Sequence, residues 1–193
     1  MKLLFVHETK FKEDEEGNLY TGGSYNKEVW DRYLFVSSDF SVIARKEEMI
    51  YKTDYSKKRF NYFDKDKINF VEVPSLFSSI GDFLEIDKHK KVNEIIKNEI
   101  LKADYLIARL PSVYGYIAVK FAKKFKKPYL IEVVGCAWDS LWNHSFKGKL
   151  FAFHSYRTMR KLLIDSPYVI YVTNDFLQKR YPSEGKVANC SIH

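Results

Sequence analysis

Six short apolar runs, distributed along the whole chain, constrain the fold most strongly. Most of them are nearly continuous rather than alternating, which is the pattern of strands covered on both faces. Between them lie three helical stripes, which are Val29, Trp30, Tyr33 and Leu34, then Val92, Ile95, Ile96 and Ile100, and last Ile117, Ala118, Phe121, Ala122 and Phe125. Strands that alternate with helices predict βαβ units, which build a parallel, doubly wound sheet. We therefore expect an α/β, Rossmann-like sandwich with a mostly parallel sheet of about six strands. The runs are residues 3–6, 42–44, 70–73, 106–110, 129–134 and 169–172.

Size and composition limit the class of protein. A chain of 193 residues is expected to form a single domain, residues 1–193. With 46% hydrophobic and 17% aromatic residues it has the composition of a folded protein rather than a disordered one. No signal-peptide pattern and no apolar run near roughly 18 residues is present, so we expect a cytoplasmic location. Cys136 and Cys190 lie far apart without a CxxC pattern, so we expect free thiols and no metal site.

Two segments depart from the alternation of strand and helix. Residues 9–20 contain the turn signal Glu15-Glu16-Gly17-Asn18 between apolar positions, which predicts a small β-hairpin flap after the first strand. Residues 51–67 mix lysines and an arginine with tyrosines and phenylalanines and show no period. We expect this segment to be a long, basic and aromatic loop.

Ligands of doubly wound sheets bind beyond the carboxyl ends of the strands, so the residues that follow each strand are the candidates for ligand binding and catalysis. The first strand ends at His7, and the chain returns through Gly22, Gly23 and Ser24 before a helix. Two glycines allow close backbone approach, and Ser24 as a helix cap favours an anion such as phosphate. A tight turn before a capped helix explains the same residues. Neither GxGxxG nor a Walker A loop is present, so no cofactor is assigned.

Later strand ends carry further polar groups. Arg109 and the expected helix cap Ser112 follow the fourth strand, where arginine suits a phosphate or carboxylate, or else a salt bridge to a neighbouring acid. Trp138, Asp139 and His144 follow the fifth strand. A carboxylate or imidazole there could accept a proton from a hydroxyl, and indole faces suit sugar rings. Capping by Asp139 and a surface position for His144 are the alternatives.

The sixth strand ends at Thr173-Asn174, where Asn174 is expected to cap a short helix.

Taken in order, several segments resemble the N-terminal half of a group 1 (family 4) glycosyltransferase of the GT-B fold, of the kind used in bacterial polysaccharide and capsule biosynthesis. The resemblance covers nearly the whole chain. The segments are the hairpin flap, Thr21-Gly22-Gly23-Ser24, Ala108-Arg109-Leu110-Pro111-Ser112, Lys127-Pro128-Tyr129, Glu132-Val133-Val134-Gly135 with Trp138-Asp139, and Tyr168-Val169-Ile170-Tyr171-Val172-Thr173-Asn174.

The resemblance implies that this half binds the acceptor, a sugar or lipid-linked saccharide, while a second half binds the nucleotide-sugar donor. It implies no further cofactor and no transferase activity of this half alone. The glycine loop, Gly22, Gly23 and Ser24, is expected to approach the donor phosphates. Asp139 and His144 are rival catalytic candidates. The residues assigned to acceptor binding are His7, Arg109, Ser112, Trp138 and Asn174.

The net charge of +7 leaves the polyanionic partner open. Attachment to the inner face of an anionic membrane would use clustered basic residues, either in residues 51–67 or on the Lys120, Lys123, Lys124, Lys126, Lys127 face, for which a solvated helix face is the alternative. A stand-alone nucleotide or phosphosugar-binding module is the rival function. Nucleic-acid binding has no recognised motif in its support, so we expect no nucleic-acid partner.

Overall fold

The computed structural model describes residues 1–76, 85–142 and 146–190. The chain divides into two compact units, Met1–Tyr105 and Leu106–His193, and each is described by itself. The expectation of a single domain over residues 1–193 stays a prediction.

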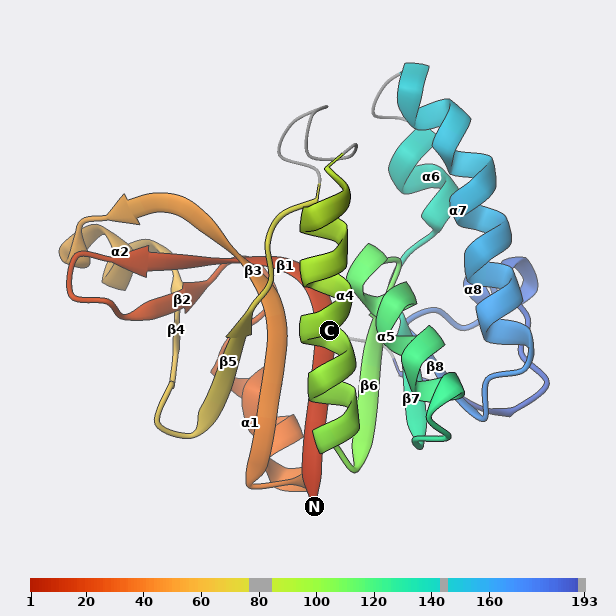
Figure 1. The fold of residues 1–193 in the computed structure, drawn as a ribbon, viewed down its shortest axis with the longest axis horizontal. Helices are drawn as coiled ribbons and strands as arrows, with labels where there is room; N and C mark the ends of the chain where they lie inside the picture. Colours follow the sequence, from red (N-terminus) through yellow and green to blue (C-terminus); the bar gives the residue numbers. More distant parts are fainter. Residues whose placement is uncertain (77–84, 143–145, 191–193) are drawn as a thin grey trace. The chain divides into compact units, whose positions relative to one another are not determined.

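The first unit is built on a five-stranded, mixed sheet in the order β4-β2-β1-β3-β5. Neighbouring strands β1, β3 and β5 are parallel, whereas β2 runs antiparallel to β1 and to β4. Helices α1 and α4 lie on opposite faces of the parallel part (Figure 1). The strands are β1 (Lys2–Asp14), β2 (Leu19–Thr21), β3 (Asp39–Tyr51), β4 (Asn61–Phe63) and β5 (Ile68–Glu72), and the helices are α1 (Lys27–Val36), α2 (Thr53–Arg59) and α4 (Ile86–Lys102).

The predicted hairpin is present. Strands β1 and β2 pair antiparallel around a turn in which Gly17 has a φ of +75°, a backbone conformation that glycine adopts without strain. We call residues 10–21 and 45–63 the flap: the outer ends of β1 and β3 together with β2, α2 and β4. In Figure 1 the flap extends to the left of the parallel strands of this unit.

The prediction that residues 51–67 form a loop is wrong. They form α2 and β4, and β4 pairs with β2. Helix α2 showed no apolar period because Ser56 is its one buried residue. Its charges suit a helix nevertheless: Asp54 lies in the first turn, and three basic residues lie in the last turn, where each sign complements the helix dipole.

The core of the first unit is aromatic. The indole of Trp30, on α1, stacks on Tyr25 with ring centroids 5.3 Å apart and meets Phe63 of β4 edge to face at 5.3 Å. Phe11 of β1 packs against the same Phe63 at 4.8 Å and against Phe70 of β5 at 4.5 Å. The flap is therefore packed onto α1 and the parallel strands through one continuous set of rings.

The second unit contains four parallel strands in the order β6-β7-β8-β9. All six predicted runs lie in or overlap strands, namely β1, β3, β5, β6, β7 and β8, and the predicted helical stripes lie in α1, α4 and α5. The chain thus has the predicted α/β fold with a mostly parallel sheet. The elements of this unit are β6 (Tyr105–Leu110), α5 (Val113–Lys124), β7 (Tyr129–Val133), α6 (Ala137–Trp142), α7 (Phe146–Ile164), β8 (Tyr168–Tyr171), α8 (Phe176–Arg180) and β9 (Lys186–Asn189).

A buried carboxylate organises the flap turn. Asp14, 2% exposed, accepts hydrogen bonds from the backbone N–H groups of Glu16 and Asn18, from the Asn18 amide and from the Tyr20 hydroxyl, at 2.8–3.0 Å. Burial disfavours its ionised form, but these hydrogen bonds outweigh burial and lower the pKa of the carboxyl from 3.8 to about 2.

This lowered pKa predicts a stability change in acid. Because the folded pKa lies below the unfolded one, the Asp14 carboxylate stabilises the fold above about pH 4, and that stabilisation is lost as the pH falls toward 2. We expect Asp14→Asn to melt at a lower temperature than the native chain at pH 7, with the difference shrinking between pH 4 and pH 2.5. Thermal unfolding across this range measures it, and a constant difference would contradict the assignment.

Candidate functional site

In the first unit, His7 lies where the regular parallel pairing of β1 with β3 ends. That pairing runs to Val6↔Ile43, and a register shift follows before Lys10. The hydroxyl of Tyr25 and Nδ1 of His7 are 2.7 Å apart, so the two side chains share a hydrogen bond. Tyr25 is buried and His7 is half-buried, so the imidazole is held in one orientation at this edge of the sheet.

The glycine loop lies directly before Tyr25. Gly23 has a φ of +61°, in the left-handed region, and a Cβ placed there would meet no atom within 4 Å. Its carbonyl accepts a hydrogen bond from the Asn61 amide at 3.2 Å. The loop therefore combines a backbone conformation that favours glycine with open space where a Cβ of residue 23 would lie.

Ser24 is exposed and is not the cap of α1. That prediction is wrong, because Asn26 is the N-cap and its side chain accepts the backbone N–H of Val29 at 3.1 Å. Both residue types cap helices well, and the sequence alone did not show which residue begins the first turn.

Arg45, which sequence reasoning missed, lies at the same edge of the first unit. Its guanidinium donates to the carbonyl of Glu8 at 2.9 Å and to the hydroxyl of Ser75 at 3.2 Å, and lies 3.7 Å from the Glu8 carboxylate. Arg45 follows the apolar run 42–44 directly. The rule that selected Arg109, a basic residue at a strand's carboxyl end, would have found it.

In the second unit, Arg109 is buried beside an acid. It pairs across the sheet with Glu132 of β7, and its Nε lies 3.9 Å from a carboxylate oxygen of that residue. The salt-bridge alternative therefore has a partner in place. Ser112 is the N-cap of α5, as predicted, and its hydroxyl accepts the backbone N–H of Gly115 at 3.1 Å.

Trp138 and Asp139 lie in the first turn of α6, after β7. The Trp138 ring stacks on Trp142 at 4.8 Å, and Tyr156 of α7 meets it edge to face at 6.2 Å. Asp139 is within the helix, half-exposed, with an oxygen 3.8 Å from the guanidinium of Arg180. His144, the rival catalytic candidate, lies outside the described residues.

A buried tyrosine fixes the start of α6. The Tyr181 hydroxyl lies 3.3 Å from the Cys136 sulfur and accepts the Trp138 backbone N–H at 3.3 Å, while the Tyr171 hydroxyl donates to the Tyr181 carbonyl at 2.6 Å. Burial, followed by the contact with Cys136, raises the pKa of Tyr181. The hydroxyl is therefore neutral at ordinary pH, and it orients the segment that carries Trp138 and Asp139.

Asn174 is exposed and does not cap α8, so that prediction is wrong. The helix begins after Asp175, and the hydroxyl of Thr173 accepts the backbone N–H of Leu177 at 3.1 Å.

Among the described residues, no group of three or more His, Cys, Asp and Glu side chains is arranged to hold a metal ion. The helices in this part of the chain are all too short or too polar to span a bilayer.

The glycine loop offers a matched pair of substitutions. Gly23→Ala forces a Cβ into the left-handed region and should destabilise the first unit by about 1 kcal/mol. Gly22→Ala is the control, since its φ is not positive and its Cβ would meet Lys12 Nζ at an ordinary 3.5 Å. Chemical denaturation of both variants measures the difference. Equal stabilities would show that the Gly23 conformation is not required.

The chain resembles known proteins in sequence and in structure. No protein-family model matches the chain. It is 33% identical over 187 residues to Protein CapJ of Staphylococcus aureus, which covers 96% of this chain and 45% of that relative. The chain therefore spans less than half the length of this relative.

The structural relatives are also longer. Sucrose-phosphate synthase of Thermosynechococcus elongatus aligns with a TM-score of 0.51 and 11% identity over 98% of this chain and 47% of its own. A UGT transferase from Siraitia grosvenorii in complex with UDP gives a TM-score of 0.43 and 12% identity over 93% of this chain and 47% of its own. At 11% identity, the likeness to the synthase concerns the fold alone. It confirms the predicted Rossmann-like α/β fold with a mostly parallel sheet.

Proposed function

We propose that this chain is the acceptor-binding N-terminal half of a glycosyltransferase of the family 4 type. The complete enzyme moves a sugar from a nucleotide-sugar donor to a polysaccharide or lipid-linked saccharide acceptor. One observation carries the proposal: the glycine loop directly precedes Tyr25, whose hydroxyl orients His7. At Gly23 this loop has open space where a Cβ would lie.

The chemistry of this edge suits a hydroxyl acceptor. An imidazole whose orientation is held by Tyr25 can hydrogen-bond a sugar hydroxyl and exchange a proton with it. The open backbone at Gly23 leaves room for a phosphate to approach closely. In the same unit, the Arg45 guanidinium lies at the edge where His7 lies, 3.7 Å from the Glu8 carboxylate, which balances its charge. These features favour a saccharide together with a phosphate-bearing donor.

The second unit contributes further proposed contacts. Arg109 is the second-last residue of β6 and Ser112 follows that strand. Trp138 and Asp139 follow β7, and Asn174 follows β8, so all lie at or near the carboxyl ends of neighbouring parallel strands. The half-buried Trp138 ring suits packing against a sugar. Asp139 is the proposed proton acceptor in this unit, although its neighbour Arg180 also pairs with it. His144 is the alternative candidate for this proton acceptor.

Donor binding is assigned to the part of the enzyme that this chain does not include. Support comes from the lengths of the relatives, of which the chain spans 45% in Protein CapJ and 47% in sucrose-phosphate synthase. The alternative, a stand-alone nucleotide or phosphosugar-binding module, would use the same glycine loop without a second half.

Thermal shift with nucleotides separates these two functions. We expect UDP, GDP and their sugars to leave the melting temperature of this chain unchanged, because most donor contacts lie elsewhere. A longer protein that adds the remaining half found in Protein CapJ should be stabilised by one nucleotide sugar. Strong stabilisation of the chain alone by a nucleotide would overturn the acceptor role and favour the binding module.

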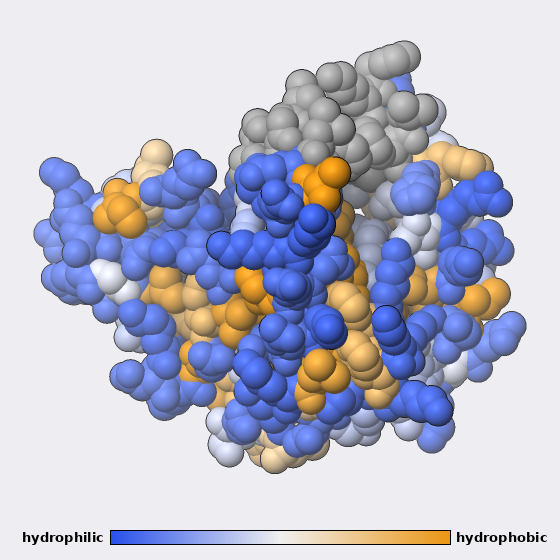
Figure 2. All heavy atoms as spheres, viewed as in Figure 1, coloured by the Kyte–Doolittle hydropathy of each residue, from blue (hydrophilic) through white to orange (hydrophobic). Residues whose placement is uncertain are grey.

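Peripheral contact with an anionic membrane is a second part of the proposal. The flap carries exposed Lys52, Lys58 and Arg59, and the chain just before them exposes Met49 and Ile50. Figure 2 shows the flap, at left, as mostly hydrophilic with a small apolar patch. The basic face at the end of α5 is partly neutralised, because Lys123 pairs with Asp165. The flap is therefore the better candidate for lipid contact.

Vesicle sedimentation tests this contact. We expect the chain to bind phosphatidylglycerol vesicles and not phosphatidylcholine vesicles. Replacing Lys52, Lys58 and Arg59 by glutamine should weaken binding about tenfold or more, since each basic residue near an anionic surface contributes roughly 1 kcal/mol. The triple variant of Lys120, Lys124 and Lys126 is the control on the α5 face. An unchanged affinity of the flap variant, or a larger loss in the control, would contradict the assignment.

A further inference from the structure

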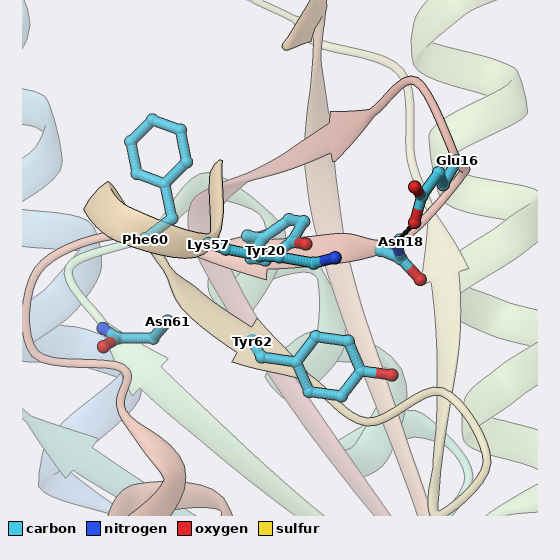
Figure 3. A pocket seen from close by; sticks show the side chains of 7 residues that line it. All are labelled: Glu16, Asn18, Tyr20, Lys57, Phe60, Asn61 and Tyr62. Carbon is cyan, nitrogen blue, oxygen red and sulfur yellow. Dashed lines mark hydrogen bonds between the residues drawn. The ribbon is translucent and has the colours of Figure 1, made fainter. Parts of the chain in front are cut away.

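The flap contains a pocket that none of the functions above uses. Its volume is about 590 Å³. Figure 3 shows the lining side chains, which come from the hairpin turn, from β2, from α2 and the residue after it, and from β4. All of them belong to the first unit. They are Glu16, Asn18, Tyr20, Lys57, Phe60, Asn61 and Tyr62.

Aromatic rings form one part of the lining. Tyr20 and Tyr62 are paired across β2 and β4, with ring centroids 5.9 Å apart in an edge-to-face arrangement. Tyr20 is buried, and its hydroxyl is fixed by the Asp14 carboxylate at 2.9 Å. Tyr62 is 54% exposed, so one ring is anchored in the protein and its neighbour is open to a ligand.

Polar groups form the rest of the lining. The Asn61 amide donates to the Gly23 carbonyl, and the Asn18 amide donates to Asp14 and to Glu16. Each amide nitrogen is thereby oriented, and each amide oxygen is an acceptor. Lys57 is exposed, and the structure gives its ammonium no ion pair within the described residues. The pocket thus presents oriented acceptors and one cation around exposed aromatic surface.

We propose that this pocket binds a segment of a saccharide chain, with an anionic substituent of that chain at Lys57. Amphipathic rings pack against the C–H faces of sugars, while amide and carboxylate oxygens accept hydrogen bonds from hydroxyl groups. A nucleic-acid strand is a poorer fit. It needs a continuous basic groove, whereas the lining of this pocket holds a single lysine together with the carboxylate of Glu16.

The pocket lies beside the proposed reaction edge rather than within it. Asn61 lines the pocket and also bonds the glycine loop, so the two sites meet at that side chain. This inference deepens the proposed function and rests on it in one respect: the chain bound in the flap is the acceptor. Saccharide binding itself requires neither donor nor second half, so it can be measured on this chain alone.

The test is a titration of the ¹⁵N-labelled chain by NMR with a hyaluronan hexasaccharide, which is acidic, and with maltohexaose, which is neutral. We expect the acidic probe to shift the amides of Asn18, Asn61 and Tyr62. Tyr62→Ala should weaken binding of that probe roughly tenfold, the loss of one aromatic contact. Lys57→Gln should weaken it about threefold and leave binding of the neutral probe unchanged.

The matched control is Tyr168→Ala, which removes an exposed tyrosine from β8 in the second unit and is not a residue of the pocket lining. It should bind both probes as the native chain does. Circular dichroism confirms that each variant is folded. Absence of shifts with both probes, shifts confined to other residues, or stronger shifts with a single-stranded oligonucleotide would overturn the pocket's assignment. Binding that depends on His7 or Arg45 but not on Tyr62 would overturn it too, and would leave the acceptor role standing.

Discussion

The packing of the Trp30 indole is the interaction on which the rest of the first unit depends. One ring, on α1, contacts Tyr25 at 5.3 Å, Phe63 at 5.3 Å and Phe11 at 6.2 Å, and so joins the glycine loop, the flap and the parallel strands. Because Tyr25 stacks on Trp30, its hydroxyl is held where it bonds His7. A smaller residue at position 30 would therefore disturb fold and site together.

Much of this arrangement could be predicted from the sequence, because strands that are buried on both faces have nearly continuous apolar runs. Continuous apolar runs marked the central strands, and the helical stripe containing Val29 and Trp30 marked α1. The rule that selected Arg109, a basic residue at the end of an apolar run, applies equally to Arg45, which directly follows the run 42–44. The order of the motifs also predicted the fold that the chain shares with sucrose-phosphate synthase.

Strand β9, helix α2 and the exact helix caps could not be predicted, because they have no regular pattern of apolar residues in the sequence. Strand β9 is exposed at all four residues, so no apolar run marks it. Helix α2 buries a single serine and is held mainly by the pairing of β4 with β2, a contact between segments about 40 residues apart. The N-caps Asn26 and Asp175 differ from the predicted Ser24 and Asn174 by two positions and one position. Such shifts depend on where the backbone first turns, which tertiary packing decides.

The geometry of the flap bears on the size of the acceptor. Strand β2 leads directly from the hairpin turn to the glycine loop, and the pocket follows it, from Glu16 and Asn18 at the turn to Asn61 at Gly23. At about 3.3 Å per residue, the three residues of β2 span roughly 10 Å. A single sugar cannot contact both ends of such a span, whereas a chain of several sugars can. The length of β2 therefore favours a growing saccharide over a monosaccharide as the occupant, with its reactive end at the glycine loop.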